Sequence, residues 1–210
     1  MKYKEIVVII FFTLVSLFMY AIFPIENSFQ QVVVMLFFFV VFPLLFNKLF
    51  LKRKVESYGL QIGDWKQGLL WTFYSLILIG LIFFVSLNYF SFLKNYSVPS
   101  YVVNNFGNFI LYEFTLVVLF VAIYEFYFRG FILFVFESNI KHWTILAQAI
   151  LFLILVLIIG GESIYQFFPY LVFAPFAGVV AYKSRSIIYS GIAQFIIIFV
   201  LDALIIKTLS

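Results

Sequence analysis

The feature that most constrains this chain is a succession of long stretches without charge. A helix that crosses a bilayer needs about 20 mostly apolar residues, because every backbone N–H and C=O must be paired within the hydrocarbon. Only 10% of the residues are charged and 66% are hydrophobic, whereas soluble domains carry about 25% charged residues. The sequence therefore predicts an all-α, polytopic membrane bundle, and it excludes a soluble globule, a disordered chain and a fibre.

Stretches of the required length recur along the whole chain, which we interpret as a single transmembrane domain over residues 1–210. The first stretch is interpreted as a retained anchor and not as a secretory signal, because no small-x-small cleavage site follows it. We expect about seven spans: Ile6–Ile25, Gln30–Asn47, Gly68–Phe92, Phe106–Phe128 with its helix continuing to about Ser138, Thr144–Ile159, Tyr165–Tyr182 and Ile187–Ile206.

The distribution of basic residues predicts the orientation of these spans. Cytoplasmic loops carry an excess of Lys and Arg. With seven spans and the N-terminus inside, only Lys94 and Lys207 of the 13 basic residues fall outside. The net charge of +4 is then explained by orientation and by attraction of Lys52–Lys54 to anionic lipid. No nucleic-acid partner is needed, and we expect membrane lipids as partners.

One acid and one arginine stand out inside the fourth span. Glu125 and Arg129 are four residues apart with the acid first, which favours an intrahelical ion pair. Ionisable groups in a membrane span are costly and are functional candidates by default. The pair is either a structural clasp at the end of a helix or part of a site, and the sequence leaves both interpretations open.

Three further polar residues could join them. Tyr124 precedes Glu125, Gln194 lies inside the last span, and Glu113 lies about three helical turns before Tyr124. We treat Tyr124, Glu125, Arg129 and Gln194 as a candidate catalytic pocket, active or vestigial, that opens to the inner leaflet, with Glu113 lining it or bonding to a neighbouring helix. Asp202 is expected to be interfacial.

The remaining polar residues predict no further chemistry. Gln148 is interpreted as a link between helices, and His142, flanked by Lys141 and Trp143, as a surface residue. The chain has no cysteine and a single histidine, so we predict no metal site and no cofactor. The sequence contains no complete motif of a zinc protease, a rhomboid-type protease or a presenilin-type protease.

The order of motifs from about Tyr58 onward resembles the CPBP family, which contains CAAX-type proteases, bacteriocin-processing and immunity proteins, and lysostaphin-resistance-type membrane proteins. Residues 58–69 look like the entry to the family's third helix, and Tyr124–Gly130 resembles its first motif, two glutamates followed by three residues, arginine and usually glycine. Phe152 resembles the start of the second motif, and Gly178–Gln194 the approach to the third. The family-like region runs over about residues 58–206.

The resemblance implies a glutamate-dependent intramembrane protease with two adjacent glutamates, the motif arginine, two histidines and an asparagine. In this sequence only two of these six positions are kept, as Glu125 and Arg129. The other four carry Tyr124 for the first glutamate, Val156 and Gln194 for the histidines, and Ile198 for the asparagine. Proteolysis by the family mechanism is therefore not expected, although whether the chain is an enzyme stays open.

We accordingly expect a non-proteolytic, multi-pass protein of a bacterial plasma membrane. It would be a scaffold, regulator or accessory subunit for an envelope enzyme, such as a cell-wall hydrolase or a lipoprotein-modifying system, or would act in bacteriocin immunity. The alternative is a membrane-embedded enzyme, either a CAAX-type endopeptidase with altered residues or a lipid- or lipoprotein-acyl-modifying enzyme that uses the pocket around Glu125. A transporter is disfavoured, because the sequence lacks inverted repeats.

Overall fold

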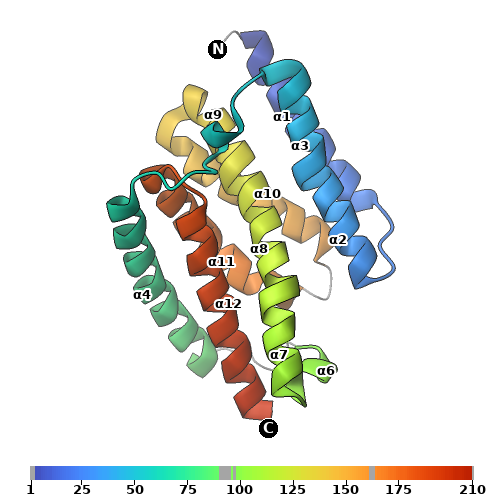
Figure 1. The fold of residues 1–210 in the computed structure, drawn as a ribbon, viewed down its shortest axis with the longest axis vertical. Coiled ribbons are helices and arrows are strands. Elements are labelled where there is room, and N and C mark those ends of the chain that lie inside the picture. The colour runs from blue at the N-terminus through green and yellow to red at the C-terminus, as the bar shows by residue number, and fades with distance from the viewer. Residues whose placement is uncertain (1–2, 90–95, 97, 161–163, 210) are drawn as a thin grey trace.

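The computed structural model describes residues 3–89, 96, 98–160 and 164–209, and every regular element in those ranges is helical. Figure 1 shows the helices side by side in one elongated bundle, with the N-terminus at one end and the C-terminus at the other. The predicted all-α bundle is confirmed. Lys2 and Lys94, which counted toward the predicted orientation, lie outside the described residues.

The first third of the bundle is built from three long helical segments. Asn27 caps the second, since its side chain accepts from the Gln30 amide at 2.9 Å, and Asp64 caps the third by accepting from the Gln67 amide at 3.1 Å. Both helices begin earlier than predicted, because the prediction followed apolar residues and the residues that cap these helices are polar. The elements are α1 (Tyr3–Ile22), α2 (Ser28–Leu36), η1 (Phe37–Val41), α3 (Phe42–Phe46), η2 (Asn47–Leu51), η3 (Val55–Tyr58) and α4 (Trp65–Tyr89).

The rest of the chain forms one long interrupted helix and three helices packed around it. Two π-helical stretches, η4 and η5, begin at Glu113 and Glu125 respectively. The elements are α6 (Ser100–Val103), α7 (Phe106–Tyr112), η4 (Glu113–Val117), α8 (Val118–Tyr124), η5 (Glu125–Ile132), α9 (Leu133–Ile140), η6 (Lys141–Trp143), α10 (Thr144–Ile159), α11 (Ile164–Ser184) and α12 (Ile188–Leu209).

Within the described ranges six helical segments are long and apolar enough to cross a membrane, and the fourth runs over 54 residues, Phe106–Ile159. This segment folds back on itself at Lys141, whose φ of 51° breaks the helix. After the reversal the Thr144 hydroxyl donates to the Leu133 carbonyl at 2.9 Å, and the Phe128 and Phe152 rings lie 5.0 Å apart. The count of seven crossings and the inside N-terminus stay predictions from the sequence.

The surface of the bundle is apolar over wide areas. Phe11, Leu111 and Leu157 are each more than 60% exposed, which would be unfavourable in water over so many side chains. Lipid is the solvent that suits this surface. Together with the six apolar segments, it identifies the chain as a multi-pass membrane protein.

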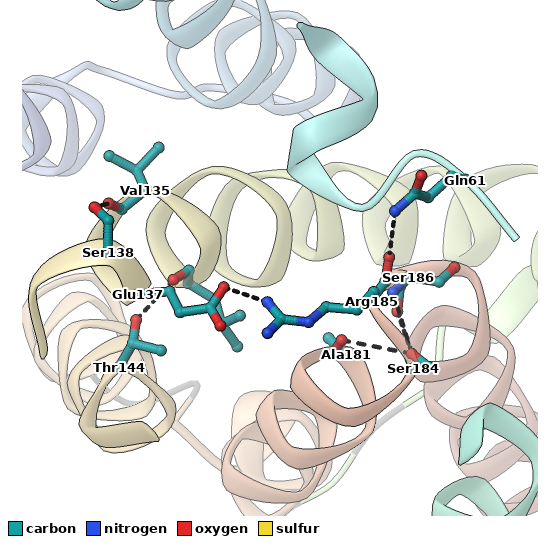
Figure 2. A network of polar contacts seen from close by, with 10 residues as sticks. Gln61, Val135, Glu137, Ser138, Thr144, Ala181, Ser184, Arg185 and Ser186 are labelled. Atoms are coloured by element: carbon teal, nitrogen blue, oxygen red, sulfur yellow. Dashed lines mark hydrogen bonds and ion pairs between the residues drawn. The ribbon is translucent and has the colours of Figure 1, made fainter. Parts of the chain in front are cut away.

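A polar network fixes the turn between α11 and α12, as Figure 2 shows. Arg185 in the turn forms an ion pair with Glu137 of α9, and Gln61 donates to the Arg185 carbonyl at 3.2 Å. The Ser184 hydroxyl donates to the Ser186 carbonyl at 2.9 Å. The Asp64 amide also donates to the Ser184 carbonyl at 2.7 Å. The first turn of α12 is therefore held against the end of α9 and the loop before α4.

Candidate functional site

A single stripe of the long helix carries both of its buried acids. Residues 113, 117, 121 and 125 are each four apart, so they project from one side of the helix. This side packs antiparallel against α12. Glu113 lies beside Asp202, Val117 and Val121 pack with Ile198, and Glu125 is bonded to Ser190.

At one end of this seam, Glu125 is buried with only 2% of its surface exposed. One carboxylate oxygen lies 3.5 Å from Nε of Arg129, and the other accepts a hydrogen bond from the Ser190 hydroxyl. The backbone of α12 comes close here, since a Cβ atom at Gly191 would lie 3.6 Å from Cγ of Glu125. The structure thus contains the expected intrahelical pair and adds a partner from α12.

Arg129 is completely buried, and its guanidinium carbon lies 5.8 Å from the centre of the Phe152 ring. Arginine stays protonated in proteins, so this buried positive charge requires an ionised partner. Glu125 is the acid that pairs with it. The terminal guanidinium nitrogens find no hydrogen-bond acceptor among the described residues, which makes the pair with Glu125 the main compensation for the buried charge.

The glycine after Arg129 allows the loop before α4 to press against this end of the helix. A Cβ atom at Gly130 would lie only 2.9 Å from the carbonyl oxygen of Tyr58. The Tyr58 hydroxyl in turn donates to Oδ1 of Asn47 at 2.5 Å. Burial raises the pKa of Tyr58 from 10.0 to about 12, against a smaller lowering by the charge of Arg53, so this hydroxyl remains a donor at neutral pH.

Beside Glu125 an apolar groove of about 360 Å³ opens between the long helix and the first turns of α12. Glu125 is the one charged residue in its lining. The other walls are hydrophobic side chains or glycine: Leu60, Val118, Val121, Ala122, Phe126, Ile187, Ile188, Gly191, Ile192 and Phe195.

Tyr124 does not share this groove. Its ring packs against Phe152 and Tyr170, at 5.5 and 5.8 Å between ring centres, and it lines a different cavity. Successive residues on a helix point about 100° apart, so neighbours in sequence reach different sides. A single pocket formed by Tyr124 and Glu125 is therefore not what the structure contains.

Gln194 is buried and lies one turn after Ser190 on α12, and its amide has no hydrogen-bond partner among the described residues. The residue that reaches Glu125 is Ser190, which sequence reasoning missed. The feature that could have identified Ser190 is its spacing of four residues from Gln194, which places both side chains on one face of α12. Val156 and Ile198, at the positions where the family would have a histidine and an asparagine, are packed in the apolar core.

Asp202 corrects a second expectation. Predicted to be interfacial, it is only 3% exposed, because Tyr96 covers it and donates its hydroxyl to Oδ1 at 2.8 Å. Glu113 lies beside Asp202 of α12, but neither of its carboxylate oxygens accepts a hydrogen bond from the described residues. No group of three or more His, Asp or Glu side chains within the described ranges could hold a metal ion.

Two smaller predictions are confirmed. His142 is exposed in η6. Gln148 links two helices, since its amide nitrogen donates to the carbonyl of Ala174 in α11 at 2.8 Å.

Residues 107–200 match the family model described as Type II CAAX prenyl endopeptidase Rce1-like. The match begins in α7 and ends in α12, so it contains Glu113, Glu125, Arg129 and Ser190. Comparisons with curated proteins and with solved structures find no match. The resemblance to the CPBP family is confirmed over this segment, and its extension back to about residue 58 and on to about residue 206 stays a prediction.

Proposed function

We propose, from the premise that residues 107–200 are an Rce1-like segment of the CAAX protease family, that this membrane protein binds a lipid-modified partner without cleaving it. It would act in a bacterial plasma membrane as a scaffold, regulator or accessory subunit for an envelope enzyme, such as a cell-wall hydrolase or a lipoprotein-modifying system, or in bacteriocin immunity. The proposal rests on two features of the same region. The oxygens of the Glu125 carboxylate face Arg129 and Ser190, and an apolar groove opens beside this carboxylate.

The observation that carries the proposal is the double engagement of Glu125. A general base must present a free carboxylate to the water that it activates. Here one oxygen faces Arg129 at 3.5 Å and the other accepts from Ser190. The positions that would hold an orienting histidine and an asparagine are filled by Val156 and Ile198, which are at most 2% exposed. Both oxygens of Glu125 therefore face groups of the protein itself, which disfavours the activation of a water molecule by this carboxylate.

The groove supports the binding half of the proposal. Its volume of about 360 Å³ falls in the range of small-ligand sites, which are mostly apolar. Each CH₂ group that a lipid chain buried there would contribute about 0.8 kcal/mol. Ile188 and Ile192 on its wall are 43% and 50% exposed, so the groove opens sideways, where a chain could enter from the bilayer.

The test uses the full chain in lipid nanodiscs and a peptide that carries a photoreactive acyl or prenyl chain. We expect crosslinks to the groove, and we expect the peptide that does not crosslink to be recovered at its full length. Val118→Trp, which fills the groove, should reduce crosslinking by about fivefold or more. Leu157→Trp is the matched control, because Leu157 is 61% exposed and lies outside the groove lining.

Crosslinking that is equal in Val118→Trp and Leu157→Trp would remove the groove as the binding site. Shortened peptide that appears with wild type but not with Glu125→Gln would establish proteolysis and overturn the proposal.

The alternative function is an enzyme, either an endopeptidase with altered residues or a lipid- or lipoprotein-acyl-modifying enzyme. The observation in its favour is that the Ser190 hydroxyl donates to Glu125, the arrangement by which a carboxylate can activate a serine nucleophile. In such a transfer the Ser190 oxygen would form an ester with the acyl carbon, the bond from that carbon to the lipoprotein's oxygen or nitrogen would break, and the serine proton would pass through Glu125 to this leaving group, so the protein would gain the mass of the acyl group less one hydrogen. Mass spectrometry of wild type and Ser190→Ala after incubation with a lipoprotein substrate distinguishes this enzyme from a binding protein.

A further inference from the structure

The opposite end of the seam contains two acids and a ring of tyrosines that the proposed function does not use. A cavity of about 460 Å³ lies there. It opens among the start of α2, the segment around Pro99 and α6, at the end of the bundle where the chain terminates (Figure 1). Asp202 forms part of its wall, and Glu113 lies within hydrogen-bonding reach of Asp202.

Among the described residues, the two acids have no fixed counter-charge. Glu113 is fully buried, and no donor of the described residues reaches either of its carboxylate oxygens. No ion pair to Glu113 or Asp202 is formed within the described ranges. Two adjacent buried carboxylates cannot both stay charged alone, so a proton or a cation must accompany them.

Five tyrosines complete the cavity: Tyr96, Tyr101, Tyr112, Tyr124 and Tyr170. They include two pairs set edge to face, Tyr101 with Tyr112 at 6.3 Å and 80°, and Tyr124 with Tyr170 at 5.8 Å and 60°. Aromatic rings that line a space can form a cage that attracts cations through the faces of the rings, and the lining of this cavity supplies five such rings. A hydroxyl donor, Tyr96, holds Asp202 in place at 2.8 Å.

We propose that this cavity, lined by Asp202 and the five tyrosines, with the buried Glu113 beside Asp202, is a binding site for a small organic ammonium group. The two carboxylates supply the charge and the rings supply the cage. The volume is far larger than a bare metal ion requires, and the described residues contain no cluster of metal ligands. An organic cation fits both the size and the lining. By the predicted orientation the site faces the outer side of the membrane.

The ammonium could come from a soluble amine or from the headgroup of phosphatidylethanolamine. Both present the same charged group to the carboxylates. The rim supports entry of either, since Tyr101 is 54% exposed and lies on the short helix α6 at the surface of the bundle.

The test is equilibrium binding of radiolabelled tetramethylammonium to the full chain in phosphatidylglycerol nanodiscs, at constant ionic strength set with NaCl. We expect saturable binding that excess unlabelled tetramethylammonium displaces and that tert-butanol, a neutral molecule of similar size, does not. Asp202→Asn and Glu113→Gln should each weaken binding by about tenfold or more, which corresponds to at least about 1.4 kcal/mol. Glu26→Gln, at an exposed acid before α2, is the control and should bind like wild type.

Tyr101→Leu keeps the proposal testable if the acid variants fold poorly, because Tyr101 is at the rim. It should weaken binding about two- to fivefold, the size of one exposed cation–ring contact. Addition of phosphatidylethanolamine to the discs should lower apparent affinity if the lipid headgroup is the natural ligand, and should leave it unchanged if a soluble amine is.

Two results would overturn the proposal. The first is the lack of saturable binding in wild type, or binding that neither acid substitution weakens. The second comes from Lys94→Gln, which removes a lysine outside the described residues. If this variant binds tetramethylammonium more than about tenfold tighter than wild type, the cation of the site is the chain's own lysine.

Discussion

The seam between the long helix and α12 contains buried acids at both ends, and their charge is compensated differently at the two ends. At one end a single acid, Glu125, faces a fixed arginine at 3.5 Å and a serine hydroxyl. At the other end Glu113 and Asp202 face each other and the phenol of Tyr96, without an ion pair among the described residues. Arg129 neutralises the first end, whereas the described residues give the second end no fixed positive charge, which is why we propose that a proton or a ligand supplies it.

The difference has a consequence for function. A carboxylate held by a permanent charge is a poor base but a stable wall for a groove. An acid pair without a fixed charge responds to whatever cation is present, and therefore suits recognition. We therefore propose that the presence of Arg129 beside Glu125 accounts for the different roles of the acids at the two ends of the seam.

The largest effect on stability is expected when the fixed charge of Arg129 is removed. Arg129→Met leaves the buried Glu125 without its partner and should lower the free energy of unfolding by about 3–5 kcal/mol. Glu125→Gln/Arg129→Met removes both charges and should recover more than half of that loss. Denaturant unfolding in detergent micelles measures both. A double variant as unstable as the single one would show that Glu125 and Arg129 do not compensate each other.

The close approach of the loop to the Arg129 end gives the next largest effect. Gly130→Ala places a Cβ atom 2.9 Å from the Tyr58 carbonyl oxygen, and such overpacking costs about 1–3 kcal/mol. The control is Gly80→Ala in the middle of α4, where a Cβ atom would meet nothing within 4 Å. That change should stabilise by about 0.5–1 kcal/mol through helix propensity. Equal effects of the two alanines would contradict the described packing.

Tyr58 makes the stability of the Arg129 end depend on pH. Its neutral form is favoured in the fold, since burial raises its pKa from 10.0 to about 12. The stability that Tyr58 contributes is therefore fully present below pH 10 and is lost as the pH rises toward 12. Tyr58→Phe should cost about 1 kcal/mol at neutral pH, the value of its bond to Asn47, and should flatten the alkaline loss. If Tyr58→Phe lost as much stability as wild type when the pH is raised above 10, this role of Tyr58 would be contradicted.

The smallest effect is expected at the acid pair. Asp202→Asn leaves no fixed charge uncompensated and keeps an oxygen for Tyr96, so stability without ligand should change by about 1 kcal/mol or less. This contrasts with the large loss in Arg129→Met. Both variants are compared in the same unfolding experiment, and a loss in Asp202→Asn as large as that in Arg129→Met would remove the distinction between the two ends.

The sequence predicted the features that depend on local spacing. The apolar segments follow from runs of uncharged residues, and the pair of Glu125 with Arg129 follows from a spacing of four on one helix. The family resemblance was confirmed because its motifs are short and continuous. The exposed position of His142 was also predicted from its charged and aromatic neighbours.

Features that depend on how distant helices pair could not be predicted in the same way. Ser190 reaches Glu125, and Asp202 meets Glu113, because the long helix and α12 run antiparallel in one register, which no single segment specifies. The separation of Tyr124 from Glu125 into two cavities depends on which neighbours surround each side of the helix. The burial of Asp202 depends on Tyr96, more than 100 residues away in sequence.

The measurement that tests the central claim most directly is infrared spectroscopy of the carboxyl groups in nanodiscs at neutral pH. Protonated acids and carboxylates absorb in separate bands. We predict a protonated-acid band in wild type that Glu113→Gln or Asp202→Asn removes, that tetramethylammonium abolishes, and that Glu125→Gln leaves unchanged. A protonated-acid band that disappears in Glu125→Gln instead would mean that Arg129 does not hold Glu125 ionised, and would contradict the account.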